Sequence, residues 1–265
     1  MSFFKWDGSP RIREFIGLSN YINIFQDKYI HIAFRNVALY IVITLLAMMI
    51  IGFILAYLLT YIATRYRVVS TMFRTVFFLP QVISGFFIGT IFLWIFTSES
   101  GYLNIFLKSI GLEQFALSWL GNPKIAIFTF LFVAFWRGFG FYVIFYLAAM
   151  QSIPMELYEA AELDGANTFK KALHITFPSV IYTHFSLLII GTIAALKVFD
   201  VVWALTGGGP VHSTEFLTTY LYNKIFFEGV SAGYGSAIAI VLLILAISIT
   251  IVYLYFYNKT KGKNE

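Results

Sequence analysis

The sequence predicts an all-α polytopic membrane protein with five transmembrane helices. Its 265 residues are 60% hydrophobic and only 12% charged, whereas soluble domains average about 25% charged residues. Five apolar stretches reach the roughly 20 residues that cross a bilayer as a helix. The first 30 residues lack an apolar core after a basic start, so we expect no cleavable signal peptide. The chain has no cysteine, which excludes disulfides and thiolate metal sites.

The apolar stretches divide the chain into one transmembrane domain, residues 36–258, and two flanking tails. The expected spans are Asn36–Ile62, Thr75–Thr97, Ile125–Met150, Phe177–Leu205 and Ala232–Tyr257. A polar insert, residues 152–178, separates the third span from the fourth. The run Gly207-Gly-Gly-Pro210 must end the fourth span, because glycine and proline break helices. We therefore expect a loop over residues 206–230.

The distribution of Lys and Arg sets the expected orientation. With the polar insert in the cytoplasm, residues 1–35 form an extracytoplasmic tail, loop 206–230 is extracytoplasmic, and residues 259–265 form a cytoplasmic tail. Cytoplasmic segments then carry more Lys and Arg than the outer loops, as is usual. The N-terminal tail is an exception, because it adds several cations outside. This cationic tail is easier to understand if a further span precedes Met1, and we hold that as an expectation.

The polar insert predicts a short acidic helix, a bend and a second short helix. Met155–Leu163 is rich in strong helix formers, Gly165 can end that helix in a left-handed conformation, and Asn167 can cap the next. An ordinary interfacial helix is the simple reading, yet such helices usually carry Lys and Arg. An acidic helix suits an anionic leaflet poorly. The small residues Ala160 and Ala161 let another surface approach, so we expect a protein-docking element.

The insert resembles the EAA signature of type I importers. Glu159-Ala160-Ala161, then Gly165, then Ile175 and Phe177-Pro178, is similar to the signature in permease subunits of bacterial carbohydrate ABC importers, with Phe177 in place of the usual Leu. Further motifs resemble the carbohydrate branch: Phe15-Ile-Gly-Leu-Ser-Asn-Tyr21, Phe73-Arg-Thr-Val-Phe-Phe-Leu-Pro80, Gln151-Ser-Ile-Pro154 and Lys197-Val-Phe-Asp200. Leu205-Thr-Gly-Gly-Gly-Pro210 resembles the maltose-importer type subunit. The resemblance implies that the insert is a coupling helix contacting a separate ATPase through Glu159, Ala160, Ala161, Asp164 and Gly165.

The resemblance also implies the partners and the location. It implies a second permease subunit in a heterodimer, two nucleotide-binding ATPase subunits and an extracytoplasmic solute-binding protein in a bacterial inner membrane. The chain lacks a G-x-x-x-x-G-K-[ST] phosphate loop, so we expect no cofactor here and ATP with Mg at the partner ATPase. The net charge of +5 needs no nucleic acid, because cytoplasmic loops explain it. We expect a transport subunit in contact with lipid, not an enzyme.

Polar and aromatic residues of the third and fourth spans are the candidates for a solute pathway. Such polar groups are costly in a membrane and usually face a cavity or a partner. A structural reading pairs Lys197 with Asp200 at i and i+3 on one helical face and lets Arg137 bond backbone carbonyls. The resemblance places sugar contacts in these two spans. The candidates are Trp136, Arg137, Gly140, Tyr142, Gly191, Ala195, Lys197, Val198, Phe199, Asp200 and Trp203, with Pro80 and Gly85 as a hinge in the second span.

Several alternatives stay open at this point. The cations Arg137 and Lys197 would also tolerate an anionic solute such as a uronate or a glycerol phosphate, although an oligosaccharide is the first expectation. A secondary transporter driven by an ion gradient would need membrane-buried carboxylates, which reduce here to Asp200. It would also show inverted repeats, and none is visible. A membrane-embedded enzyme would need a catalytic constellation, which the sequence does not offer.

Overall fold

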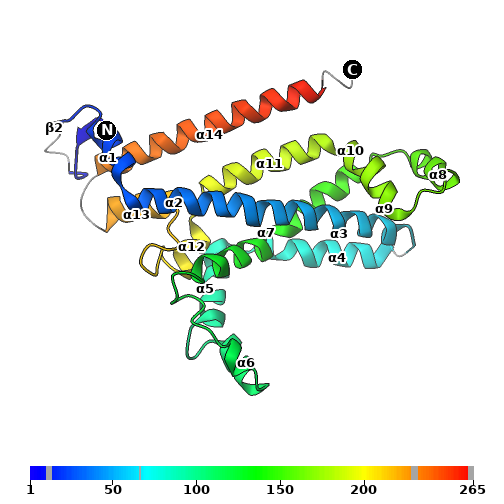
Figure 1. Ribbon diagram of the computed structural model, residues 1–265, viewed down its shortest axis with the longest axis horizontal. Coiled ribbons are helices and arrows are strands. Elements are labelled where there is room, and N and C mark those ends of the chain that lie inside the picture. Colours follow the sequence, from blue (N-terminus) through cyan, green and yellow to red (C-terminus); the bar gives the residue numbers. More distant parts are fainter. Residues whose placement is uncertain (10–13, 66, 228–231, 262–265) are drawn as a thin grey trace.

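The computed structural model is almost entirely helical and describes residues 1–9, 14–65, 67–227 and 232–261 (Figure 1). A two-stranded antiparallel hairpin, β1 (Phe4–Lys5) and β2 (Glu14–Phe15), precedes the helices. The helices of the first half are α1 (Ser19–Gln26), α2 (Lys28–Leu39), η1 (Tyr40–Leu45), α3 (Leu46–Arg65), α4 (Arg67–Val82), α5 (Gly85–Phe96), α6 (Tyr102–Ser109) and η2 (Glu113–Phe115). Those of the second half are α7 (Ala126–Met150), α8 (Met155–Leu163), α9 (Thr168–Lys171), η3 (Ala172–Thr176), α10 (Phe177–Ser179), α11 (Ile181–Leu196), α12 (Asp200–Leu205), α13 (Leu217–Phe226) and α14 (Ala232–Lys261).

Among the described residues, three helices are long and apolar enough to cross a membrane without a break. They are Lys28–Thr60, which joins α2, the π-helix η1 and α3, then Ala126–Met150, and Ala232–Lys259. They correspond to the first, third and fifth expected spans. The all-α polytopic fold is confirmed. The first helix starts eight residues before the expected Asn36, because Asp27 caps it by accepting a hydrogen bond from Tyr29 N.

The second and fourth expected spans are not single straight helices. Val68–Val82 and Gly85–Phe96 meet at 93°, and Thr168–Ser179 and Ile181–Leu196 meet at 68°. Counting each bent pair as one span gives the five that the sequence predicts. The bent pair of the fourth span ends at Leu196, and α12 is a separate helix. The sequence predicted a hinge at Pro80 and Gly85 in the second span but no bend in the fourth, because apolarity reports burial in a bilayer and not the path of the backbone.

Glycines allow the helices of the bundle to approach closely. In Figure 1, α3, α4 and α7 run side by side, while α5 and α6 project away from them. A Cβ on Gly52 of α3 would lie 2.7 Å from Tyr142 Cβ of α7. A Cβ on Gly140 of α7 would lie closer than 3.0 Å to the carbonyl of Phe77 in α4. The predicted pathway residue Gly140 is thus a packing contact between α7 and α4.

The bundle has two distinct ends. Figure 1 shows α8 and α9 at one end, called here the α8 end, and α1, α13 and the hairpin at the other, called here the α13 end. The N-terminus lies at the α13 end, and α14 runs from there toward the α8 end (Figure 1). The predicted domain boundaries and the side of the membrane that each end faces stay predictions. Residues 228–230 of the predicted loop and 262–265 of the predicted tail lie outside the described residues.

We expect Gly140→Ala to destabilise the protein. The added Cβ would meet a backbone carbonyl, which cannot rotate away, so α4 and α7 must separate at a cost of about 1–3 kcal/mol. Thermal unfolding of the purified protein in detergent should show a lower midpoint. The matched control is Gly138→Ala in the same helix, where the Cβ would meet only the flexible end of Met48. Equal midpoints for Gly140→Ala and Gly138→Ala would contradict this account of the packing.

Candidate functional site

A cavity of about 300 Å³ lies among the helices of the bundle. It opens between the two hydrophobic clusters of the core, since Phe130 and Val201 belong to one and Met48 and Tyr142 to the other. The lining residues are Tyr40, Met48, Gln81, Phe130, Ala134, Arg137, Gly138, Phe141, Tyr142, Ile190, Gly191, Ala194, Val198, Asp200 and Val201. The cavity thus draws on every expected span except the last.

Small residues and aromatic rings together shape this cavity. A Cβ on Gly191 of α11 would lie 2.5 Å from the Tyr142 hydroxyl, so the absence of a side chain lets that tyrosine point toward α11. Phe141 and Tyr142 are edge to face with ring centroids 5.8 Å apart. The result is a pocket with apolar walls and a few polar groups, which is the usual composition of a small-molecule site.

Arg137 and Asp200 bring opposite charges to the cavity. Arg137 Nη2 donates to Ile83 O at 3.5 Å, while its Nε is buried without a hydrogen-bond partner. Asp200 begins α12, and its Oδ1 accepts a hydrogen bond from Val201 N at 2.9 Å. Within the described residues no ion pair joins Arg137 to Asp200. Both groups therefore keep hydrogen-bonding capacity.

Lys197 lies outside this cavity. Helix α11 ends at Leu196, and Phe199 has a non-helical backbone (φ −141°, ψ −65°) before α12 begins. Lys197 lines a separate apolar groove with residues of α13 and α14. The prediction that Lys197 and Asp200 share one helical face was therefore wrong, because the helix breaks between them. The idea of two cations beside one pathway loses its basis.

The structure separates the other predicted pathway residues into three groups. Tyr142, Gly191 and Val198 line the cavity together with Arg137 and Asp200. Trp136, Gly140 and Ala195 serve the packing: Trp136 contacts Phe92 edge to face, and Ala195 is fully buried. Phe199 and Trp203 stack on each other with centroids 5.6 Å apart and pack against Tyr222 of α13. Their flat faces meet each other instead of the cavity.

The predicted hinge residues flank the break in the second span. Pro80 lies inside α4, and Gly85 is the first residue of α5. The break itself lies between Val82 and Gly85. A Cβ on Gly85 would collide with the carboxylate of Asp200, so glycine is required here by the close approach of α5 to α12.

The predicted coupling segment folds as its residues suggest. Helix α8 spans Met155–Leu163 with none of its residues buried, Gly165 has φ +75°, and the Asn167 side chain caps α9 by accepting from Lys170 N at 2.9 Å. Pro154 is the N-cap residue of α8. Of the five predicted docking residues, Glu159, Ala160, Asp164 and Gly165 are exposed and Ala161 is half-buried.

One side-chain contact holds the predicted coupling segment to the bundle, and another lies within the segment. Tyr57 of α3 donates its hydroxyl to Thr168 O at 3.0 Å, and the Tyr158 hydroxyl of α8 lies 2.8 Å from Thr176 Oγ1. An ion pair between Lys171 and Glu162 closes the turn, and because Glu162 is largely exposed it adds little stability. The segment is thus a surface platform fixed to the end of α3.

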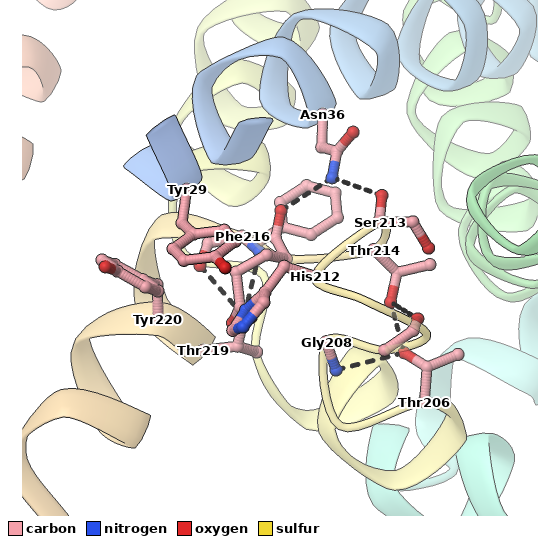
Figure 2. A network of polar contacts seen from close by, with 12 residues as sticks. Tyr29, Asn36, Thr206, Gly208, His212, Ser213, Thr214, Phe216, Thr219 and Tyr220 are labelled. Atoms are coloured by element: carbon pink, nitrogen blue, oxygen red, sulfur yellow. Dashed lines mark hydrogen bonds and ion pairs between the residues drawn. The ribbon is translucent and has the colours of Figure 1, made fainter. Parts of the chain in front are cut away.

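At the α13 end, the loop after α12 is held by a buried polar network (Figure 2). Asn36 of α2 donates from Nδ2 to Ser213 O at 2.9 Å and to Glu215 O at 2.8 Å. The carboxylate of Glu215 meets His212 Nδ1 at 2.8 Å and accepts from Thr219 Oγ1 at 2.7 Å. The loop is therefore tied to the first span.

The network leaves one apolar residue at the tip of this loop. Val211 is 80% exposed and has φ +51°, a left-handed conformation that is unusual for a β-branched residue. His212 also has a positive φ, and its ring packs on Tyr29 with centroids 4.0 Å apart. Backbone strain of this kind persists only where the surrounding structure enforces it, which the hydrogen bonds of Asn36 and Glu215 do.

A family comparison decides the identity. Residues 52–262 match the family described as "Binding-protein-dependent transport system inner membrane component". The chain belongs to this family. It is 40% identical over 238 residues to the "Probable ABC transporter permease protein YurN" of Bacillus subtilis, covering 90% of this chain and 80% of that protein. It is 32% identical over 235 residues to the "Lactose transport system permease protein LacF" of Rhizobium radiobacter, covering 88% and 78%.

A solved structure shows the same fold. A bacterial ABC transporter "involved in the import of the acidic polysaccharide alginate" matches with a TM-score of 0.81 and 24% identity, over 95% of this chain and 85% of that one. The resemblance to permeases of carbohydrate ABC importers is thus confirmed, and this multi-pass membrane protein is the permease subunit of an ABC importer. The ion-driven transporter and the membrane-embedded enzyme are not favoured.

In this permease, sequence reasoning missed cavity residues of the first two spans. Tyr40, Met48 and Gln81 line the cavity but were not among the candidates. Gln81 carried a usable signal, because a polar side chain inside an apolar span usually faces protein. Tyr40 and Met48 carried none, since both suit a lipid-facing or a packed position equally well.

The buried carboxyl of Glu215 makes the stability of the folded loop after α12 depend on pH. Burial raises the pKa of Glu215 above its ordinary value of 4.5, and hydrogen bonds from Thr219 and His212 offset only part of that rise. A raised pKa means that the folded loop binds the proton more tightly, so this contribution to stability is full below pH 4.5 and is lost as the pH rises through the folded-state pKa.

We therefore expect hydrogen-exchange protection of residues 206–216 to decline as the pH rises from 4.5, after correction for intrinsic exchange. Glu215→Gln should flatten this trend, because the amide does not ionise. The control is Glu113→Gln in the exposed η2 segment, which should leave the trend unchanged. A trend in Glu215→Gln as steep as in the wild type would show that another group causes it.

Proposed function

We propose that this permease forms half of a translocation pathway for a sugar or oligosaccharide and that the cavity around Arg137 and Asp200 is its solute site. The observation that carries the proposal is the composition of the cavity. Its aromatic rings can contact the apolar faces of a sugar ring. Arg137, Gln81 and the Asp200 carboxylate can exchange hydrogen bonds with hydroxyl groups.

The charges of the cavity favour a neutral sugar over an anionic one. The cavity contains the cation Arg137 and the anion Asp200, and Lys197 lies elsewhere. A solute carboxylate would be attracted by Arg137 but repelled by the like charge of Asp200. In a site of low dielectric this repulsion disfavours the binding of an anionic solute. The lactose permease of Rhizobium radiobacter, by its name, serves an uncharged disaccharide. A uronate or a glycerol phosphate is the weaker candidate.

The α8 segment is proposed as the element that couples this subunit to an ATPase. None of the residues of α8 is buried, its acidic residues suit a basic groove, and Leu163 offers an apolar contact that is 91% exposed. Such apolar exposure favours a protein partner. Because Tyr57 fixes the segment to α3, a displacement of α8 would be passed to a helix that lines the cavity.

The remaining partners follow from this assignment. We propose a heterodimer with a second permease subunit, two ATPase subunits that hold ATP and Mg, and an extracytoplasmic solute-binding protein, all at a bacterial inner membrane. The family description itself names binding-protein dependence. The rigid loop with Val211 at its tip is the proposed contact for that protein. Closure of the ATPase dimer would then move the coupling helices and turn the cavity outward to receive the solute.

We expect Glu159→Lys to weaken the docking of the ATPase by about tenfold, because reversing a charge at an interface replaces an attraction with a repulsion. The measurement is ATPase activity of the assembled complex, with solute-loaded binding protein and without it, together with co-purification of the ATPase. The control, Glu113→Lys, reverses an exposed charge away from α8. If Glu159→Lys changes neither the docking of the ATPase nor the stimulation of its activity, the α8 segment does not couple this subunit to the ATPase.

We expect Phe141→Ala to raise the solute concentration for half-maximal uptake by about two- to tenfold, because an aromatic wall of the site is lost. Uptake into proteoliposomes would be measured with maltose, maltotriose, lactose and galacturonate. Phe132→Ala, in the same helix but outside the cavity and 53% exposed, is the control. Galacturonate as the preferred solute would overturn the neutral-sugar proposal, and equal effects of the two variants would overturn the site.

A further inference from the structure

The break between α4 and α5 leaves two helix ends inside the membrane region. The two helices meet at 93°, with Ile83 and Ser84 between them. Helix α4 ends with carbonyl groups that have no partner in the helix, and α5 begins with free N–H groups, since its first backbone bond runs from Ile88 N to Ser84 O. In a membrane such groups must be stabilised by protein.

Each of these two ends faces a side chain of the complementary charge. Arg137 Nη2 donates to Ile83 O, directly after the C-terminal end of α4. The Asp200 carboxylate packs against Gly85, the first residue of α5, so closely that no side chain fits there. A cation is favourable at a helix C-terminus and an anion at a helix N-terminus. The placement therefore stabilises both ends of the bend.

The carboxylate of Asp200 serves two helices at once. Its Oδ1 accepts from Val201 N at the start of α12, while the same group lies over the start of α5. Helices α5 and α12 also touch at Gly89, where a Cβ would lie 2.7 Å from Ala204 Cβ. Asp200 thus lies at the contact between α5, the second half of the broken second span, and α12, the helix that follows α11.

We propose that Arg137 and Asp200 are positioning residues that hold the α4–α5 bend, and that a solute in the cavity resets the bend by engaging the same two side chains. The first half rests on the contacts alone. The second half rests on the proposed function, because it requires the solute in this cavity. Both side chains line the cavity, and Arg137 Nε is buried without a hydrogen-bond partner. Solute occupancy and the direction of α5 then depend on one pair of groups.

A suppressor experiment tests the role of Asp200. In Gly85→Ala the new Cβ would displace the carboxylate, and we expect solute-stimulated ATPase activity of the assembled complex to fall by about tenfold, as overpacking predicts. Asp200→Ala alone should lower it by about two- to fivefold, the size of a lost charge–dipole interaction. In the double variant the collision is absent, so activity should return to the level of Asp200→Ala.

Gly89→Ala is the matched control, because its Cβ meets Ala204 and the backbone of Val201 on the same pair of helices but no carboxylate. Asp200→Ala should not restore Gly89→Ala. Rescue of both glycine variants, or of neither, would show that Asp200 does not position α5. Arg137→Gln should reproduce the loss of stimulation, while Arg137→Lys, which keeps the cation, should retain most of it.

A distance measurement separates the bend from the solute. The chain contains no cysteine, so spin labels can be placed at Leu79→Cys in α4 and Trp94→Cys in α5, both more than half exposed, in a complex whose partners lack cysteine. We expect Gly85→Ala and Arg137→Gln to shift the distance distribution without solute. Unchanged distributions in both would overturn the positioning role. We also expect the best transported of maltose, maltotriose and lactose to shift the wild type. If the distance distribution shifts in the variants but not in the wild type on adding that sugar, the positioning role of Arg137 and Asp200 stands. The link between the solute and the bend would then be wrong, and so would the proposed solute site.

Discussion

A bilayer offers the backbone no hydrogen-bond partner, and the architecture of this permease depends on that constraint. Three of its spans satisfy it by continuous helix. The other two are bent pairs, and α5, the second half of the broken second span, packs on α12, the separate helix that follows α11, through Gly89 and Ala204. Helix α12 thus supplies protein cover to the second half of the broken second span. Arg137 and Asp200 lie at the two helix ends of the α4–α5 break, where a charge of the complementary sign is stabilising.

The lengths of the spans were predictable, while the directions of two of them were not. Hydropathy reports how much apolar surface a segment offers, and on that measure a bent pair equals a straight helix. The break after Leu196 falls in Lys197-Val-Phe199, which contains neither glycine nor proline. Pro80 did signal a disturbance, but the helix continues past it to Val82. Only tertiary packing of α5 against α12 explains where the chain turns.

The fold of the predicted coupling segment depends on local sequence and could be predicted, whereas the set of residues that line the cavity depends on long-range packing. Gly165 and Asn167 act on their own neighbours, so their roles could be predicted from a few residues of sequence. Lys197 was assigned to the pathway because the helix was assumed to continue to Asp200. Instead, residues 197–199 are not helical, and Lys197 lines another groove. Tyr40 and Gln81 enter the cavity from spans that the resemblance did not point to. The face of a helix on which a residue lies can therefore be predicted only within one unbroken helix.

The first span connects the three regions that the proposed cycle requires. Near one end Asn36 holds the loop that carries Val211, in the middle Tyr40 and Met48 line the cavity, and near the other end Tyr57 bonds the coupling segment. Lys28–Thr60 is helical throughout, so a displacement of the coupling segment would be carried to the cavity and the loop by a single rod. Its π-helical stretch, Tyr40–Leu45, begins at the cavity residue Tyr40. Such stretches are concentrated at functional sites, and this one adjoins the proposed solute site.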